Sequence, residues 1–299
     1  MPRSTWFLAA LLAASSVFGT EIGLYVENDA LMPQHADNDY THGTMLYCID
    51  DAGYHTKVQQ NMYTPSDLRR SDHIEGDRPY CGLFLGSFGH EFFEKKDSDW
   101  IHYGELSVGI VGPSARCEKT QKWVHKQIGA REPKGWEHQL HDEAVVNVQW
   151  WETYDWKICK YVALLPRAGV LAGNLQDAAE VGCDLRLGWN VSERRVTDNG
   201  IMFSAPKDKA WSDQLSFYVF GGASERYYLY NHILEGSMFN HKDDDLKVDI
   251  EPWVTELRCG CAFKFHGFTA AYTMLFRSDE FKHQKNSPDY GSISIGYCW

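Results

Sequence analysis

Apolar and polar side chains alternate with a period of two along most of the chain, and the 3.6-residue period of a helix is rare. Residues 181–191 carry an unbroken apolar row on one face and place Asp184 and Arg186 on the other, and residues 106–110 alternate in the same way. A strand of a transmembrane barrel has this pattern because one face meets lipid and the other lines a polar lumen. A soluble sandwich with one solvated face gives the same alternation, so the pattern alone leaves both folds open.

The connections between alternating runs favour the barrel. The runs at residues 248–265 and 268–277 are separated only by His266 and Gly267, which indicates a tight hairpin turn. Longer charged segments, such as residues 278–288, are expected at the opposite end of the strands. Short turns at one end and long loops at the other are typical of bacterial outer-membrane barrels.

The chain closes on a further alternating run, residues 290–299. Ile293, Ile295, Tyr297 and Trp299 share one face of it, as expected of a lipid-facing closing strand.

These patterns predict an all-β fold, a transmembrane antiparallel β-barrel of about twelve strands. It forms one domain over residues 21–299, because no internal repeat or linker interrupts it. The predicted strands begin near Glu21, His42, Gly82, His102, Ala144, Tyr161, Val181, Gln214, Tyr227, Val248, Phe268 and Tyr290.

One helix interrupts the alternation, between the predicted fourth and fifth strands. Residues 116–128 have helical periodicity, with Trp123, Val124 and Ile128 on the apolar side. Ser114 is a suitable N-cap and Gly129 a suitable C′ residue. The segment is too short and too charged to cross a bilayer, so we expect it to pack on the lumen or the rim of the barrel.

The first twenty residues have the features of a signal peptide. Arg3 supplies a positive charge, residues 6–14 form a short apolar core, and small residues follow. Cleavage is expected near residue 20, so the protein is exported.

Composition narrows the function. The formal net charge is -12, which argues against nucleic acid as a partner, because no basic stripe is present to neutralise phosphates. The 14% share of aromatic residues suits the interfacial girdles of a membrane barrel, although a carbohydrate-binding β protein would share it. The eight cysteines include no CxxC pair, so we expect packing roles rather than a metal site.

Two acidic clusters lie near the N-terminal end of the mature chain. Asn28 and Asp29 follow the first predicted strand, where such residues commonly form a turn. Residues 37–43 place acidic side chains one residue apart, so their oxygens could bind calcium, although the spacing is not that of an EF-hand. A solvated turn explains this second cluster equally well.

Two further positions suggest a reactive site. Arg78 could clamp a phosphate bidentately, or it could form a structural ion pair with Asp77. His125, on the predicted helix, could act as a general base near neutral pH. There is no G-x-S-x-G elbow and no glycine-rich phosphate loop, so the residues alone do not name a reaction.

Taken in order, these clusters resemble the outer-membrane lipid A 3'-O-deacylase family. The similarity covers most of the mature chain and is densest over residues 21–143. It is carried by residues 27–29, 39–43, 63–65, 77–82, 109–113, 121–125, 133–136 and 291–295, together with Gln139, Leu140 and Glu143.

The resemblance implies a calcium-dependent hydrolase of the bacterial outer membrane that removes the 3'-acyloxyacyl chain of lipid A. His125 would activate the attacking water, and Asp29 would hold Ca2+ or orient the site. Asn28 and Thr41 would shape the site by hydrogen bonding, and Arg78 would contact the phosphate or glucosamine region of the lipid. The partners implied are lipopolysaccharide and the outer membrane, with no obligate protein partner evident.

Three positions depart from the family pattern. His42 stands where Asn is usual, and Cys81 where Ala is usual. Asp77 occupies a position that can be Lys, so we count it among the substrate-binding residues that set which phosphorylated lipid fits. The roles proposed for the other site residues are unaffected.

Two other functions fit the same barrel. One is a calcium-dependent outer-membrane phospholipase with a Ser-His-Asn site. The other is a porin or adhesin in which Asn28, Arg78 and His125 are structural.

Overall fold

The computed structural model describes residues 20–32, 39–50, 52–92, 99–191, 195–196, 207–208 and 215–298. The predicted signal peptide lies outside these ranges, apart from its last residue, Thr20. The aromatic last residue of the chain, Trp299, also lies outside them. No helix within them is long and apolar enough to span a membrane.

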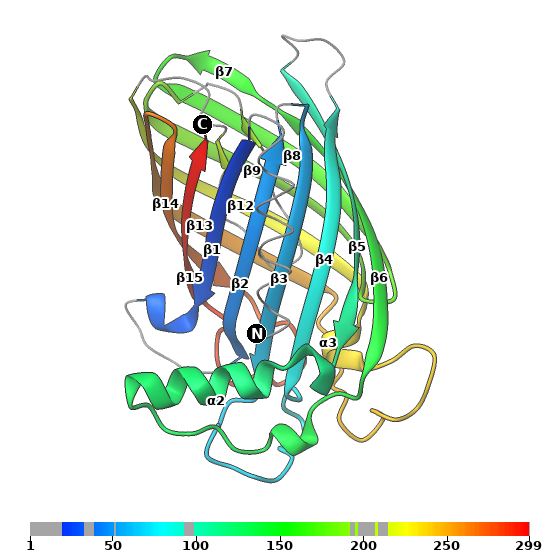
Figure 1. Cartoon of the computed structure of the whole chain (residues 1–299). Helices are drawn as coiled ribbons and strands as arrows, with labels where there is room; N and C mark the ends of the chain where they lie inside the picture. Colours follow the sequence, from blue (N-terminus) through cyan, green and yellow to red (C-terminus); the bar gives the residue numbers. More distant parts are fainter. Residues whose placement is uncertain are drawn as a thin grey trace.

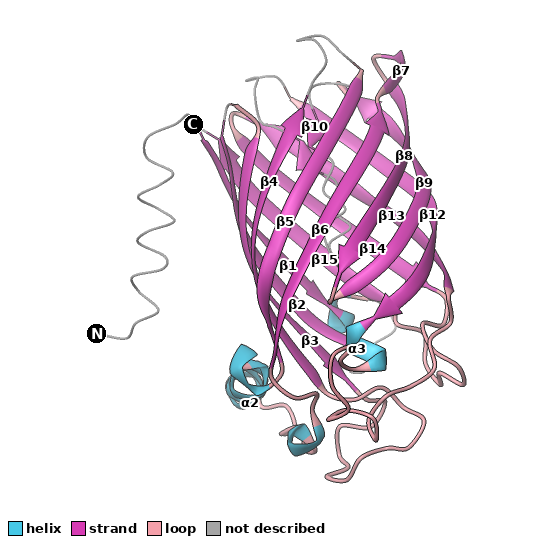
Figure 2. Ribbon diagram, turned by 90° about the vertical axis from the view of Figure 1, so that its right-hand side faces the viewer, coloured by secondary structure: helices cyan, strands magenta, loops and turns pink. Residues whose placement is uncertain are grey.

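The described strands form one closed antiparallel barrel (Figures 1 and 2). Twelve strands make the wall, and β7 (Trp156–Cys159) extends one hairpin beyond it. Pairing of β1 with β15 and of β6 with β8 closes the barrel. The wall strands are β1 (Thr20–Asn28), β2 (Asp39–Asp50), β3 (Tyr54–Thr64), β4 (Cys81–Phe92), β5 (Trp100–Val111), β6 (Glu143–Tyr154), β8 (Val162–Gly173), β9 (Gln176–Trp189), β12 (Ser216–Asn231), β13 (Trp253–Phe265), β14 (Phe268–Arg277) and β15 (Tyr290–Cys298). Separately, β10 (Arg195–Val196) pairs with β11 (Lys207–Asp208).

The predicted barrel and its strand number are confirmed, but two strand assignments were wrong. Strand β3 was not predicted, because its outward row includes Thr56 and Gln60 and is only weakly apolar. Strand β12 was predicted as two strands, because Gly221 and Gly222 interrupt the alternation there. Gly222 is needed because a Cβ atom would lie 1.8 Å from a carboxylate oxygen of Asp184. As a result, the helix follows the fifth wall strand rather than the fourth.

The predicted division into lipid and lumen faces is confirmed. Leu106 and Val108 point outward on β5 and are 47% and 50% exposed, whereas Glu105 and Ser107 are buried inside. The outward row of β15 likewise exposes three large apolar side chains, Ile293, Ile295 and Tyr297.

The predicted hairpin turn at His266 and Gly267 is also confirmed. Their φ angles are 47° and 79°, so both lie in the left-handed region that a two-residue hairpin requires. The preceding strand begins at Trp253, not at Val248 as predicted. Val248 instead lies in a small apolar cluster with Leu234.

Loop lengths orient the barrel in the membrane. The segments that precede β2, β4, β6, β13 and β15 gather at the lower end in Figure 1 and have ten or more residues each. Four of the five connections at the upper end, where the C-terminus lies, have seven residues or fewer; the exception precedes β12. Bacterial barrels place short turns in the periplasm and longer loops outside the cell. The lower end, which carries α2 (Cys117–Ile128), is therefore the extracellular end.

Paired charges fill part of the lumen. Arg167 contacts Glu180 at 3.0 Å and Asp184 at 2.8 Å, and Asp184 also pairs with Arg258 at 2.7 Å. A buried charge is tolerated when it is paired and hydrogen-bonded. These pairs link β8, β9 and β13 across the interior.

Candidate active site

Helix α2 lies across the outside of the barrel at its extracellular end (Figure 1). It follows a short 3-10 helix, η2 (Pro113–Ala115), and ends at Gly129, whose φ of 69° suits the predicted C-terminal glycine. The predicted N-cap was wrong. Arg116 occupies that position, and Ser114 instead bonds to Asp142 through its backbone N and its hydroxyl, both at 2.7 Å.

The buried side of α2 is not its apolar side. Cys117, Gln121 and His125, spaced four residues apart, form the buried stripe. Trp123 and Ile128, which belong to the apolar side expected to pack, are 63% and 70% exposed. The helix does pack at the rim, but through polar residues and a cysteine.

The start of α2 is fixed to the outer surface of the wall. Gln60, in the outward row of β3, donates a hydrogen bond of 2.6 Å to the carbonyl oxygen of Ala115. Met62, from the same row, is buried in a cluster with Cys117 and Trp136. Burial raises the pKa of the Cys117 thiol to about 12, so this cysteine serves as a neutral packing group. The N-terminus of α2 therefore lies over β3 and β4.

The register of the wall places His125 near the first strands. Asn28 pairs with His42, His42 with Met62, and Met62 with Gly82, so these four residues form one level across β1 to β4. A Cβ at Gly82 would lie 3.0 Å from Cys117, which puts the helix start at this level. Figure 1 shows α2 running from there toward β1.

The helix rise and the strand spacing allow an estimate of how far along α2, from β4 toward β1, His125 lies. The eight residues from Cys117 to His125 advance roughly 12 Å along the helix. Three strand spacings, from β4 to β1, amount to roughly 14 Å. From these lengths we infer that His125 lies toward β1 and β2, on the outer face of the barrel.

Asn28 and Thr41 lie together at this position. Asn28 caps a 3-10 turn by accepting from the backbone N of Ala30 at 2.8 Å, and its amide donates to the carbonyl oxygen of Thr41 at 2.8 Å. A bulge in β2 between Tyr40 and His42 turns the Thr41 hydroxyl toward that of Thr64, 2.6 Å away. The site-shaping residues implied by the resemblance are thus adjacent.

Asp29 follows directly, as the first residue of the 3-10 helix η1 (Asp29–Leu31), and its side chain is buried. Asp37 and Asn38 of the second acidic cluster lie outside the described residues. Within the described part of the chain, no three or more His, Cys, Asp or Glu side chains converge as a metal site. Calcium also binds backbone carbonyl oxygens and water, so a single buried carboxylate fits a site completed by such ligands.

The imidazole of His125 is held in a defined orientation. Its Nδ1 lies 2.5 Å from the carbonyl oxygen of Arg131, which can only accept, so Nδ1 donates and Nε2 carries the lone pair in the neutral ring. One turn earlier, the Oε1 of Gln121 accepts from the indole N–H of Trp136 at 2.7 Å. The amide Nε2 of Gln121 is buried without a hydrogen-bond partner among the described residues. This amide is a hydrogen-bond donor beside the candidate base. The i, i+4 spacing of Gln121 and His125 is the feature of the sequence that could have identified it.

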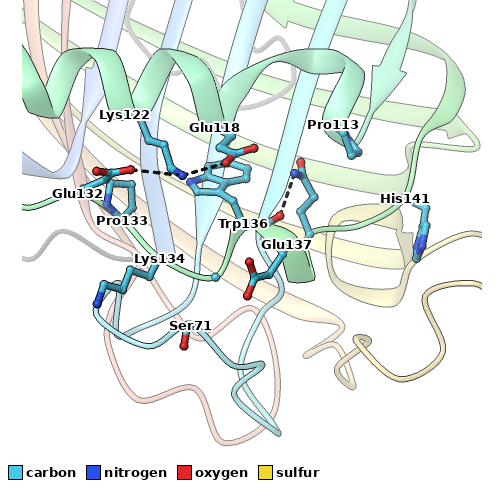
Figure 3. A pocket seen from close by; sticks show the side chains of 12 residues that line it. Ser71, Pro113, Glu118, Lys122, Glu132, Pro133, Lys134, Trp136, Glu137 and His141 are labelled. Carbon is cyan, nitrogen blue, oxygen red and sulfur yellow. Dashed lines mark hydrogen bonds and ion pairs between the residues drawn. The ribbon is translucent and has the colours of Figure 1, made fainter.

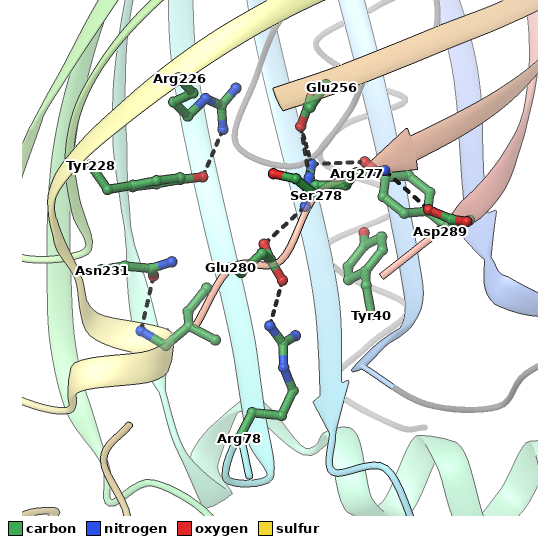
Figure 4. Close-up of polar contacts among 12 residues, drawn as sticks. Tyr40, Arg78, Arg226, Tyr228, Asn231, Glu256, Arg277, Ser278, Glu280 and Asp289 are labelled. Carbon is green, nitrogen blue, oxygen red and sulfur yellow. Dashed lines mark hydrogen bonds and ion pairs between the residues drawn. The ribbon is translucent and has the colours of Figure 1, made fainter. Parts of the chain in front are cut away.

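Arg78 lies inside the barrel mouth, on the other side of the wall (Figure 4). Its guanidinium is 2.5 Å from the carboxylate of Glu280 and faces the rings of Tyr63 and Phe281. With only 2% of the residue exposed, the structure does not favour the direct lipid contact implied by the resemblance.

Asp77 is buried beside Arg78 and braces the loop before β4. One carboxylate oxygen accepts from the backbone N and the hydroxyl of Ser66, at 2.9 and 2.6 Å, and the other accepts from the backbone N of Arg78 at 2.9 Å. These bonds give Asp77 a structural function through Ser66 and the backbone of Arg78, in addition to the structural ion pair with Arg78 considered from the sequence.

A pocket of about 660 Å³ opens on the loop side of α2 (Figure 3). Glu118 and Lys122 of the helix point into it, with Glu132 opposite. Lys122 contacts Glu118 at 3.0 Å and Glu132 at 3.4 Å. His125 is not among the lining residues, so this pocket and the outer-face site are separate features.

Comparisons with known proteins identify the family and the fold. The family of outer membrane protein LpxR matches residues 4–299. The chain belongs to this family. Its barrel is similar to that of LpxR from Salmonella typhimurium, with a TM-score of 0.77 at 20% identity over 93% of this chain and 100% of that one. Membership of the LpxR family places the protein in the outer membrane.

Other solved barrels are more distant. The KdgM porin in complex with disordered oligogalacturonate has a TM-score of 0.42 at 6% identity, with 93% and 99% of the two chains covered. The β domain of the Bordetella autotransporter BrkA has a TM-score of 0.45 at 10% identity, with 94% and 99% covered. No curated protein matches the chain.

Proposed function

We propose that this LpxR family member is a lipid A 3'-O-deacylase that hydrolyses the ester of the 3'-acyloxyacyl chain. The observation that carries the proposal is the position of His125, on the buried stripe of a helix fixed to the outer face of the barrel. A site there opens toward membrane lipid rather than toward the lumen. Lipid A, an amphiphile of the outer leaflet, can reach it from within the membrane.

His125 acts as the general base. Its Nδ1 is oriented by the carbonyl of Arg131, so Nε2 accepts a proton from water as that water attacks the ester carbonyl. The protonated ring then returns the proton to the leaving alkoxide of the sugar. Asn28 and Thr41 hold the strand ends opposite the base, and the Gln121 amide supplies a donor beside it.

Calcium belongs to the same proposal. Asp29 would hold it, and when bound the ion would supply positive charge for the developing oxyanion. The acidic cluster at residues 37–43 is the nearest further source of oxygen ligands in the sequence.

We assign Arg78 and Asp77 an indirect role in substrate binding. Both are buried, so we assign them to holding the loop before β4 and the mouth of the barrel in shape. Their substitution would alter the fit of the lipid through that loop.

The two alternative functions are less well supported. In a Ser-His-Asn phospholipase an Asn side chain orients the histidine, whereas the Arg131 carbonyl performs that task for His125. A porin needs an open lumen, whereas charged pairs such as Arg226–Glu180 and Arg277–Glu256 lie within this one.

Purified protein in vesicles that contain lipid A tests the proposed reaction. We expect release of the acyloxyacyl fatty acid in the presence of calcium, its loss with excess chelator, and no inhibition by a serine-directed reagent. Activity that persists in chelator contradicts the metal assignment, and inactivation by the serine reagent favours the phospholipase.

A further inference from the structure

Helix α2 carries an exposed apolar side that neither the fold nor the proposed reaction uses. Trp123, Val124 and Ile128 are 63%, 36% and 70% exposed. At 100° per residue, Trp123 and Val124 fall between the cationic stripe and the buried stripe. Ile128 has the angular position of the buried stripe, but it is the last residue of the helix and is exposed there. Exposed aromatic and aliphatic side chains grouped in this way mark an interaction surface.

The cationic stripe shows which way the apolar side faces. Lys119, Lys122 and Lys126 are spaced by three and four residues and therefore share a face. Lys122 points toward the extracellular loop and its Glu132 (Figure 3). On the helical wheel Val124 and Ile128 lie opposite these lysines, so they face the membrane-spanning part of the barrel. Trp123 lies beside Lys119 and opposite the buried stripe, so it faces away from the wall.

The surface next to that side is the lipid-facing belt, the exposed apolar side chains in the outward rows of the wall strands. The start of α2 rests on outward residues of β3, and its far end extends past the wall toward and beyond β1 (Figure 1). On β1, Leu24 is an exposed outward residue of the belt. The apolar side of α2 is thus continuous with a surface that lipid already covers.

We propose that α2 lies in the outer-leaflet interface, with Trp123, Val124 and Ile128 in contact with lipid and the three lysines directed at the headgroup and aqueous side. A short helix that exposes Trp and aliphatic residues beside a stripe of Lys is typical of such a position. Lys side chains extend their charged ends toward water from this depth. The aromatic Trp123 joins Trp253 on β13 in a belt at the extracellular rim.

The proposal also has a consequence for the reaction, which rests on the proposed function. Because His125 is on the same helix, lipid contact by the apolar side would hold the base at the depth of the sugar–acyl boundary. The helix would then act as a positioning element for a membrane-borne ester.

Tryptophan quenching in reconstituted vesicles tests the lipid contact directly. The fluorescence of Trp123 is obtained as the difference between wild type and W123F, in vesicles with and without brominated phosphatidylcholine. We expect quenching by the brominated lipid that matches the wild type minus W253F difference, since Trp253 is an outward rim residue. Trp136, buried beneath α2, provides the unquenched control through W136F.

Two results would overturn the proposal. One is a Trp123 signal quenched by aqueous acrylamide and insensitive to brominated lipid. The other is a signal that changes with the protein-to-lipid ratio, which would show that a second copy of the chain covers this side.

The double variant W123S/I128S separates the inference from the proposed function. We expect a loss of roughly tenfold in hydrolysis of lipid A in vesicles, equivalent to about 1.4 kcal/mol, and little change on lipid A dispersed in detergent. Equal losses in both would contradict a membrane role. Lipid quenching of Trp123 in a protein without deacylase activity would leave the membrane contact standing and reject the proposed function.

Discussion

At the scale of single residues, Glu280 is the carboxylate on which the barrel mouth depends. It pairs with Arg78 at 2.5 Å and with Arg277 at 3.1 Å, and all three side chains are buried (Figure 4). Burial by itself would raise the pKa of Glu280, but the two guanidinium groups outweigh it and hold the pKa below its ordinary value.

Replacing Glu280 by Ala should therefore destabilise the protein strongly. Two buried cations would lose their partner, which costs about 3–5 kcal/mol in comparable cases. Unfolding in urea, followed by the loss of heat-modifiable migration, measures the change. The exposed neighbour provides the control as D279N, and equal stability of E280A and D279N would contradict the role.

The ion pairs of Glu280 also predict that the stability of the protein depends on pH. Because the pKa of Glu280 is lowered on folding, its contribution to stability is complete above the ordinary value of 4.5 and is lost as the pH falls through the folded value. We expect stability to drop on acidification below about pH 4.5 in wild type. The drop should be smaller in E280Q, and an unchanged pH profile in that variant would exclude Glu280 as the titrating group.

Asp29 should determine cation binding. Asn at this position keeps the shape but removes the charge that a hard cation prefers. We expect D29N to lose calcium-induced thermal stabilisation and sensitised terbium luminescence, whereas D279N retains both. Terbium luminescence in D29N as strong as in wild type would show that the cation binds at another site.

Residue pairing was the least predictable part of the site. The sequence placed an acid, Asp77, next to Arg78, yet the ion pair forms with Glu280, some two hundred positions away. Barrel closure brings the loop before β15 against the loop before β4, and no local pattern encodes that contact.

At the scale of elements, the hairpin between β13 and β14 depends on its glycine. Gly267 has φ 79°, and a Cβ there would lie 2.2 Å from the carbonyl oxygen of Cys298. Gly129, at the end of α2, has φ 69° with nothing within 4 Å. We expect G129A to cost about 1 kcal/mol, from the left-handed backbone alone.

G267A should cost clearly more than G129A, since the clash with the β15 backbone adds to the same strain. Urea unfolding of the two variants makes the comparison. Equal losses would show that the turn relaxes and that the clash is not felt.

How well each element was predicted follows from how sharp its pattern is. The outward rows of β5 and β9 are strongly apolar and were recognised, whereas the outward row of β3 includes Thr56 and Gln60 and the strand was missed. For α2 the helical period was clear, but its buried side was assigned by hydrophobicity. The stripe that packs contains Gln121 and His125, the two polar residues that we assign to the proposed site.

At the scale of the whole molecule, the barrel wall separates two environments, the lumen and the outer face. The sequence identified candidate site residues but did not predict which of them lie on each side. Arg78 and the buried ion pairs belong to the lumen side, whereas Asn28, Thr41 and His125 belong to the outer face at the extracellular rim. The bulge at Thr41 and the helix fixed across β3 and β4 form the outer site that we propose. Period-two alternation predicted the wall, but the side of the wall that carries the chemistry follows only from strand register and from where α2 is anchored.

Mass spectrometry of lipid A from bacteria that express the protein tests the site and its reaction together. Wild type and H138N should lack the 3'-acyloxyacyl chain, since His138 is exposed and lies outside the proposed site. H125N should leave lipid A intact, because losing a general base lowers the rate by about 10²–10⁴-fold. Complete deacylation by a folded H125N, or intact lipid A with wild type, would contradict a His125-dependent deacylase on the outer face of this barrel.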